Sequence, residues 1–108
     1  MDLKEIAEKG KQIEEEIGIN IDDILNKLTQ EVGELNDAIQ KHRGIYCRSR
    51  EEDLEHIKEE FGDVFFNLIS LCYRIGLNPE DLSKYAEITL EKFEKRKKNY
   101  LEVRQNKK

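Results

Sequence analysis

Residues 21–39, which read IDDILNKLTQEVGELNDAI, carry the pattern that decides the fold. Their apolar side chains recur at steps of one, three and four positions: Ile21, Ile24, Leu25, Leu28, Val32, Leu35 and Ile39. This spacing places them on one face of an α-helix. Asn20 can cap that helix, and Asp22 and Asp23 follow in the first turn, where the helix dipole favours negative charge. The stretch therefore predicts an amphipathic helix that ends near Gly44.

The same helical spacing recurs in three other segments. A capping pattern at Asp2 precedes the first, the capping-box pattern of residues 49–52 opens the third, and the run NPED at residues 78–81 opens the fourth. No segment alternates with period two, so the chain is predicted to be all-α, with a frayed tail over residues 105–108. The predicted helices cover residues 3–17, 21–43, 50–75 and 79–101.

A short loop joins the second and third predicted helices, so we expect them to lie antiparallel as neighbours. The expected architecture is four-helix bundle-like, with this long pair at its centre. The 108 residues are enough for one domain, residues 1–108, whose motif-bearing core covers about residues 20–104. Because the first helix is short and its apolar stripe is narrow, we expect a homo-oligomer, either a dimer or a pair of dimers.

Composition narrows the class of function. The formal net charge is −5, which disfavours binding to nucleic acid. No apolar run approaches the roughly 20 residues that span a bilayer, and the N-terminus lacks a signal-peptide core. A cytoplasmic protein without a membrane partner is therefore expected, and Cys47 and Cys72 are expected to be free thiols.

Two pairs of acidic residues carry the chemistry. Glu31 and Glu34 are three positions apart on the second predicted helix, as are Glu60 and Asp63 on the third. At 100° per residue, the members of each pair lie roughly 70–80° and 130–140° from the middle of their apolar stripe, in the same rotational direction. In an antiparallel pair of helices, such offsets fall on the same side. The hairpin is thus predicted to gather four carboxylates along one edge.

Four clustered carboxylates repel one another unless their pKa values rise or cations bind. Oxygen ligands select Mg²⁺, Mn²⁺ or Ca²⁺, and Asn67, four positions after Asp63, can add a neutral oxygen. The alternative is that these acids form a solvated face of a non-catalytic helical interaction module. His56 lies on the flank of Glu60, where it either supports the site or belongs to the surface. Glu14 and Glu15 lie outside both acidic pairs, and we expect them to tolerate replacement by the amide.

Basic residues supply candidate phosphate contacts. Lys92 and Arg96 are four positions apart on the fourth predicted helix, where they either contact phosphates or form an exposed ladder with neighbouring glutamates. The loop of residues 42–50, which contains Arg43, is locally basic and includes a tyrosine. It can contact a nucleotide or serve as a solvated turn.

Taken together, these segments resemble the MazG-like nucleotide pyrophosphohydrolases. The run LTQEVGEL at residues 28–35, followed by residues 38–39, resembles the first motif of that family, and EEFGDVFF at residues 59–66 resembles the second. The segments LNPEDL at residues 77–82 and KFEKR at residues 92–96 resemble the helix that follows.

The resemblance implies an oligomeric all-α enzyme that uses Mg²⁺, with Mn²⁺ as a substitute. It implies hydrolysis of a nucleoside or deoxynucleoside triphosphate between the α- and β-phosphates, which gives a monophosphate and pyrophosphate. Such an activity suits house-cleaning of the nucleotide pool. Carried over by motif, the phosphate contacts would be Lys92 and Arg96, and the metal ligands would be Glu31, Glu34, Glu60 and Asp63.

The chain also departs from the family pattern. Gln30 stands where many members have a second glutamate, so Glu59 is the remaining candidate to orient a water molecule. The absence of tryptophan disfavours dCTP as the substrate. Phosphoribosyl-ATP pyrophosphohydrolase is a close alternative, but its second motif typically has alanine before the aspartate and Tyr-His after it. This chain has Gly62 and then Phe65, Phe66 and Asn67.

Overall fold

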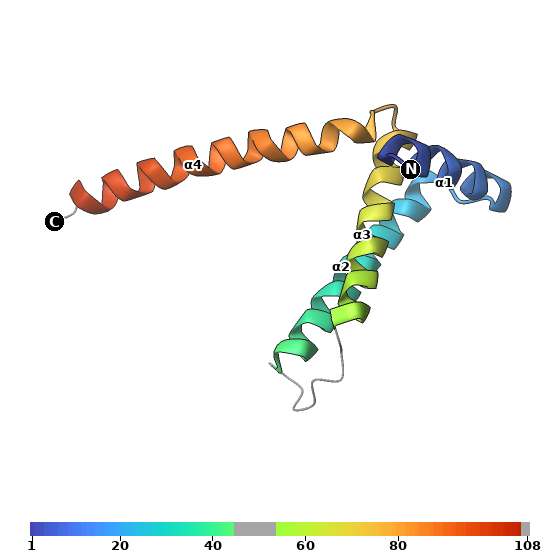
Figure 1. Ribbon diagram of the computed structural model, residues 1–108, viewed down its shortest axis with the longest axis horizontal. Helices are drawn as coiled ribbons and strands as arrows, with labels where there is room; N and C mark the ends of the chain where they lie inside the picture. Colours follow the sequence, from blue (N-terminus) through green and yellow to red (C-terminus); the bar gives the residue numbers. More distant parts are fainter. Residues whose placement is uncertain (45–53, 107–108) are drawn as a thin grey trace.

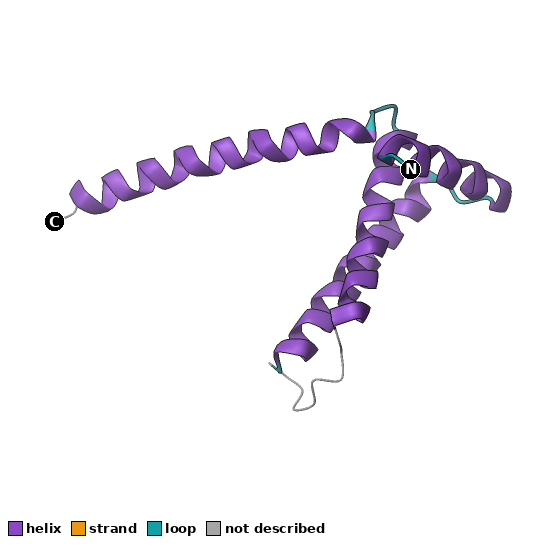
Figure 2. Cartoon of the chain, in the orientation of Figure 1, coloured by secondary structure: helices purple, strands orange, loops and turns teal. Residues whose placement is uncertain are grey.

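Four α-helices and one short 3₁₀ turn make up the part of the chain that the structure describes (Figures 1 and 2). The computed structural model describes residues 1–44 and 54–106. Within these ranges there is no strand, so the prediction of an all-α chain is confirmed. None of the helices described is long and apolar enough to cross a membrane. In chain order the elements are α1 (Leu3–Ile17), α2 (Ile21–Arg43), α3 (Leu54–Arg74), η1 (Pro79–Asp81) and α4 (Leu82–Asn106).

The helices begin and end at the residues that the sequence singles out. The Asn20 side chain accepts a hydrogen bond from the backbone N–H of Asp23, and the Asp23 side chain accepts one from the backbone N–H of Asn20, both at 2.9 Å. This reciprocal capping box starts α2. Gly18 and Gly44 end α1 and α2 in the left-handed region, with φ angles of 80° and 71°.

The predicted start of the third helix cannot be compared with the structure, and the observed end of the fourth helix differs from the prediction. The capping-box pattern at residues 49–52 and Cys47 fall outside the described residues, whereas Cys72 is a buried free thiol, as expected. The helix α4 continues through Gln105 and Asn106, which the sequence predicts to be frayed. Its last turns are rich in residues of good helix propensity, so the helix continues where the apolar stripe has ended.

The antiparallel pair α2–α3 forms the long central body, and α1 packs across one end of α3 (Figure 1). Ile24, Ala38, Ile57 and Ile69 are the main buried apolar residues between these helices. α1 approaches α3 closely at Gly10, where an added Cβ would lie 2.9 Å from Cζ of Phe66. Glycine at this position therefore lets α1 lie directly against the Phe66 ring.

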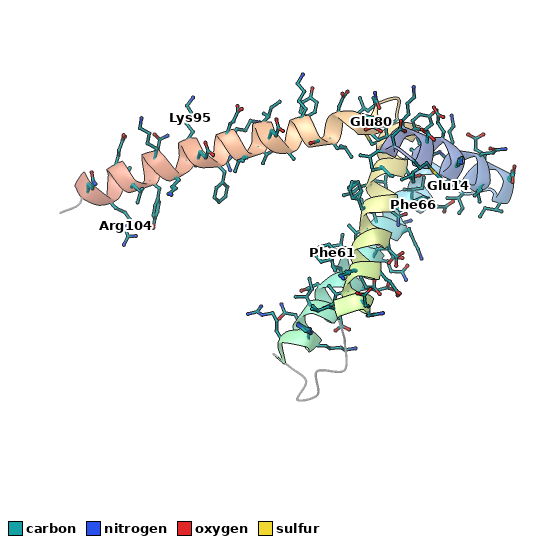
Figure 3. The ribbon with its side chains drawn as sticks, viewed as in Figure 1. Glu14, Phe61, Phe66, Glu80, Lys95 and Arg104 are labelled. Carbon is teal, nitrogen blue, oxygen red and sulfur yellow. The ribbon has the colours of Figure 1, made fainter. Side chains whose placement is uncertain are left out.

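The fourth helix stands away from the central pair. Among the described elements, α4 contacts only η1, and Figure 3 shows its side chains projecting without neighbours along most of its length. The radius of gyration is 18.5 Å, against about 13 Å for a compact chain of this size. The antiparallel pair is as predicted, but within one chain the fourth helix does not complete a bundle. Its apolar stripe faces no other helix among the described residues.

Candidate metal centre

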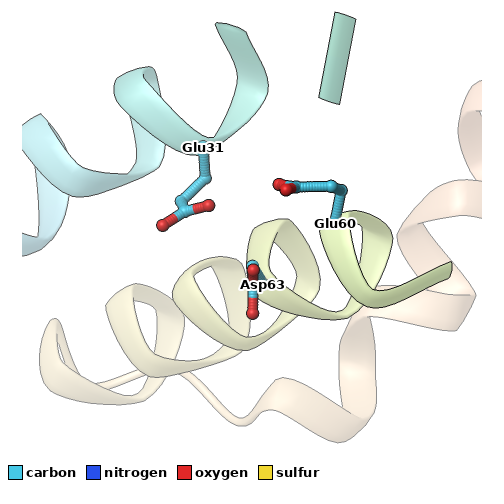
Figure 4. A group of neighbouring side chains, drawn as sticks. All are labelled: Glu31, Glu60 and Asp63. Atoms are coloured by element: carbon cyan, nitrogen blue, oxygen red, sulfur yellow. The ribbon is translucent and has the colours of Figure 1, made fainter. Parts of the chain in front are cut away.

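Three of the four predicted carboxylates converge between α2 and α3. Glu31 comes from α2, and Glu60 and Asp63 come from α3 (Figure 4). One carboxylate oxygen of each lies within 4.8 Å of the others. The angular positions predicted from the sequence therefore place these three residues along one edge of the α2–α3 hairpin.

Two oxygens of this cluster are buried and lack hydrogen-bond partners. They are Oε2 of Glu31 and Oε2 of Glu60. Burying a carboxylate oxygen without a partner is unfavourable, because it loses its hydration and gains nothing in return. A divalent cation would satisfy both oxygens, and an all-oxygen donor set suits Mg²⁺ or Mn²⁺. The residues present therefore fit a hard metal ion.

The pKa of Glu60 is raised by its burial and by the neighbouring carboxylates. Burial is the main cause that raises its pKa, and the negative charges of Glu34, Asp63 and Glu31 raise the pKa further. His56 acts in the opposite direction, with its Nε2 atom 3.3 Å from Oε1 of Glu60. Of the two interpretations of His56 from the sequence, the contact favours the one that places it beside the site.

Lys27 is a member of the site that sequence reasoning missed. Its Nζ lies 3.1 Å from Oε1 of the buried Glu31, one helical turn away. The hydrogen bond to Glu31 and then the charge of Glu31 raise the pKa of Lys27. The spacing of four positions is a signal for such a pair, but it is common on polar helix faces and does not by itself point to a site.

Glu34 does not join the other three carboxylates. Its Oε1 accepts a hydrogen bond from Nε2 of Gln30 at 3.1 Å, which holds the side chain along the exposed face of α2. It is still close enough for its charge to raise the pKa of Glu60. Gln30, the departure from the family pattern, is thus a hydrogen-bond partner of Glu34.

The remaining candidates lie at different distances from the centre. Asn67 is buried and donates from Nδ2 to the backbone carbonyl of Asp63 at 2.8 Å. Glu59 is exposed and lies 4.0 Å from Nδ1 of His56. Arg43, twelve positions after Glu31 on the same helix, is about 18 Å farther along its axis. The structure therefore does not bring Arg43 to the cluster.

Lys92 and Arg96 are also apart from the carboxylates within one chain. Both lie on α4, which makes no contact with α2 or α3 among the described residues. Their side chains are exposed. Within one chain, the structure therefore does not bring Lys92 and Arg96 to the carboxylates.

A cavity of about 620 Å³ adjoins the carboxylates. Glu31 and Asp63 line one part of it, and Glu14 of α1 lines another. Glu14 is buried and accepts a hydrogen bond from Oγ of Ser70 at 2.7 Å. The sequence led us to expect that Glu14 tolerates replacement by the amide, but it gave no sign that this side chain is enclosed between α1 and α3. Glu15 is exposed.

The sequence of this chain also matches a family model. This family model describes the MazG nucleotide pyrophosphohydrolase domain and matches residues 19–101, which is most of the chain. The chain belongs to the MazG nucleotide pyrophosphohydrolase family. Comparisons with curated proteins and with solved structures gave no match. The match contains both acidic pairs but begins after α1, so the wall of the cavity that contains Glu14 lies outside it.

Proposed function

We propose that the chain is a Mg²⁺-dependent nucleoside triphosphate pyrophosphohydrolase. It would cleave a nucleoside or deoxynucleoside triphosphate between the α- and β-phosphates, giving a monophosphate and pyrophosphate, and act in nucleotide-pool house-cleaning in the cytoplasm. The observation that carries this proposal is the convergence of Glu31, Glu60 and Asp63, with two buried carboxylate oxygens that lack partners, in a chain of this family.

The side chains divide the work of such a site. Glu31, Glu60 and Asp63 would hold the cation, and Glu34 would become a fourth ligand after release from Gln30. A bound divalent cation supplies charge neutralisation for the phosphates and lowers the pKa of an attacking water molecule. Glu59 lies on the exposed side of α3 and can orient that water or accept its proton.

Three further side chains support these ligands. His56 lies against Glu60 and lowers the pKa of that carboxyl, and Lys27 pairs with Glu31 at 3.1 Å. Asn67 ties its amide to the carbonyl of Asp63 and stiffens that turn of α3. These contacts fix the orientation of the acidic side chains before a cation or nucleotide arrives.

A panel of nucleotides tests the activity. Purified protein is incubated with each common NTP and dNTP and with phosphoribosyl-ATP, with and without Mg²⁺, and pyrophosphate and monophosphate are measured. We expect release that requires Mg²⁺ and falls at least about 100-fold in Glu60→Gln, Glu31→Gln and Asp63→Asn. Glu15→Gln is the matched control and should keep wild-type activity. Release from phosphoribosyl-ATP alone would favour the histidine-synthesis relative, and no release from any substrate would favour a non-catalytic module.

The position of α4 leads to a second part of the proposal. We infer a homodimer or a pair of dimers in which α4 of one copy covers the α2–α3 pair of another, so that Lys92 and Arg96 reach phosphates in the partner's site. This follows from the exposed apolar side chains on both surfaces, such as Phe93 of α4 and Phe61 and Phe65 of α3. An ordinary stable fold does not leave so many large apolar groups in water.

Mixing two inactive variants tests this sharing of the site. Glu60→Gln and Arg96→Ala are unfolded together and refolded as a mixture. If Arg96 acts in the partner's site, each mixed dimer contains one intact site, and about a quarter of the wild-type activity should return. If both residues act within one chain, the mixture should stay as inactive as its components.

A further inference from the structure

The cavity beside the carboxylates has the position and size to receive the nucleoside part of a substrate. Its volume of about 620 Å³ is in the range of small-molecule pockets. Since Glu31 and Asp63 line it, a triphosphate at the metal centre would place its nucleoside at or near this opening. The two other cavities described are lined by neither residue.

The walls of the cavity suit a flat aromatic ring. Most of its lining is apolar and comes from α1, the α1–α2 connection, α2 and α3: Ile13, Ile17, Ile19, Ile24 and Phe66. Gly10 also lines it, next to the Phe66 ring. An apolar recess with an aromatic side chain favours a base over a sugar or a free phosphate, because stacking and burial of the ring stabilise it.

Glu14 gives this recess a specific polar group. The side chain is about nine-tenths buried, and Figure 3 shows it where α1 crosses α3, close to Phe66. Both carboxylate oxygens lie near the Ser70 hydroxyl, at 2.7 and 3.0 Å, but that hydroxyl has a single proton to donate. Arg74 is 3.9 Å away and donates instead to the backbone carbonyl of Ile19 at 2.8 Å.

The carboxylate therefore has unused capacity to accept hydrogen bonds. Among the described residues, Ser70 is the one hydrogen-bond donor that the structure gives Glu14, whereas an ionised carboxylate offers about four acceptor sites. A buried anion with spare acceptors is best complemented by a ligand with two adjacent N–H donors.

We propose that this cavity binds the base of the nucleotide and that Glu14 makes the site selective for guanine. Guanine presents its N1–H and its 2-amino group side by side, so both can donate to one carboxylate. Adenine and cytosine place an acceptor nitrogen beside their amino group, and uracil and thymine place carbonyls on both sides of N3–H. These acceptors would face the Glu14 anion and be repelled. The inference rests on the proposed function, because that function places the phosphates at the carboxylates.

Binding of substrate analogues tests the inference without turnover. The α,β-methylene analogues of GTP, ATP, UTP and CTP cannot be cleaved at the proposed bond, and their affinities for the full chain with Mg²⁺ are measured by calorimetry. We expect the GTP analogue to bind about 10- to 100-fold more tightly than the others. Glu14→Gln should lose most of that preference, because its amide puts a donor where guanine needs an acceptor. Glu15→Gln, one position later and exposed, should keep it.

The outcomes separate this inference from the proposed function. Equal affinity of the wild type for all four analogues would overturn the guanine assignment even if pyrophosphate is released from nucleotides. An unchanged preference in a folded Glu14→Gln would do the same. If Glu14→Gln does not fold, Ile17→Trp provides the second variant, since Ile17 lines the cavity but is 67% exposed. Filling the recess there should weaken all four analogues, and unaltered binding would overturn the placement of the base.

Discussion

Lys27 and His56 already occupy part of the volume around the candidate metal centre. Each lies against one carboxylate of the cluster, yet the buried atoms Oε2 of Glu31 and Oε2 of Glu60 remain without partners. Nitrogen side chains thus reduce the repulsion among the acids but leave the inner oxygens unsatisfied. A cation that binds these oxygens would add stabilisation that the apo chain lacks.

This leads to a prediction for metal and thermal stability. Millimolar Mg²⁺ should raise the melting temperature of the wild type, because it binds the native carboxylates and not the unfolded chain. Glu60→Gln should show a much smaller rise, since it lacks one ligand charge. Differential scanning fluorimetry with and without Mg²⁺ measures both, with Glu15→Gln as the control. Equal rises in wild type and Glu60→Gln would place the metal elsewhere.

The raised pKa of Glu60 predicts a pH dependence in the absence of metal. Because its pKa is higher in the native state than its ordinary value of 4.5, the native state binds this proton more tightly than the unfolded state. Ionisation of Glu60 therefore costs stability, and that cost is greatest at neutral pH and disappears as pH falls through the raised pKa.

The comparison of Glu60→Gln with wild type isolates this effect. Without Mg²⁺, Glu60→Gln should be the more stable protein at neutral pH, and the difference in free energy of unfolding should shrink as the pH is lowered toward 4.5. Urea unfolding at a series of pH values in a chelator measures it. A difference that grows on acidification would contradict the assigned direction.

At the scale of the elements, local rules of the sequence account for most of the fold. The cap at Asn20 and the glycines after α1 and α2 act within a few residues, so the sequence is enough to predict them. The shared edge of the carboxylates follows from helix geometry and one antiparallel pairing. The position of the Glu34 side chain cannot be predicted in this way, because its carboxylate can either accept a hydrogen bond from Gln30 or join the other acids.

The way in which α1 packs on α3 could not be predicted from the sequence pattern. A narrow stripe of isoleucines predicts that α1 is amphipathic but does not tell which residue meets Phe66, or that Glu14 is enclosed with Ser70. Such burial of an acid depends on the crossing of two helices that are far apart in the sequence. Helical spacing alone therefore does not distinguish the buried Glu14 from the exposed Glu15.

A prediction at this scale concerns the contact of Gly10 with Phe66. Gly10→Val should destabilise the protein by about 1–3 kcal/mol, because added methyl groups would meet the ring and push α1 away from α3. In a Phe66→Ala background the same change should cost much less, since the space is then open. Urea unfolding of the four proteins of this cycle measures the coupling. Equal costs in both backgrounds would mean that the contact does not determine how α1 docks.

At the scale of the whole molecule, the single chain is not a closed structure. Its radius of gyration is well above that of a compact chain, and within residues 1–44 and 54–106 no other α-helix packs against α4. Periodicity alone identifies an apolar face but not what covers it, so the sequence predicts the helix and leaves its partner open. The central pair has a matching exposed surface that includes Phe61, Phe65 and Leu68.

The last prediction tests whether a second copy covers these faces. In sedimentation experiments at tens of micromolar, a concentration chosen for the test, we expect a dimer or a pair of dimers. Phe93→Asp should shift the protein toward monomer, because Phe93 is 67% exposed in the single chain and a charge there would be buried in the assembly. Lys95→Asp is the matched control: it lies two positions later, about 200° around the same helix, and should leave the assembly intact. A wild-type monomer, or equal dissociation by both variants, would contradict an interface on the Phe93 face of α4.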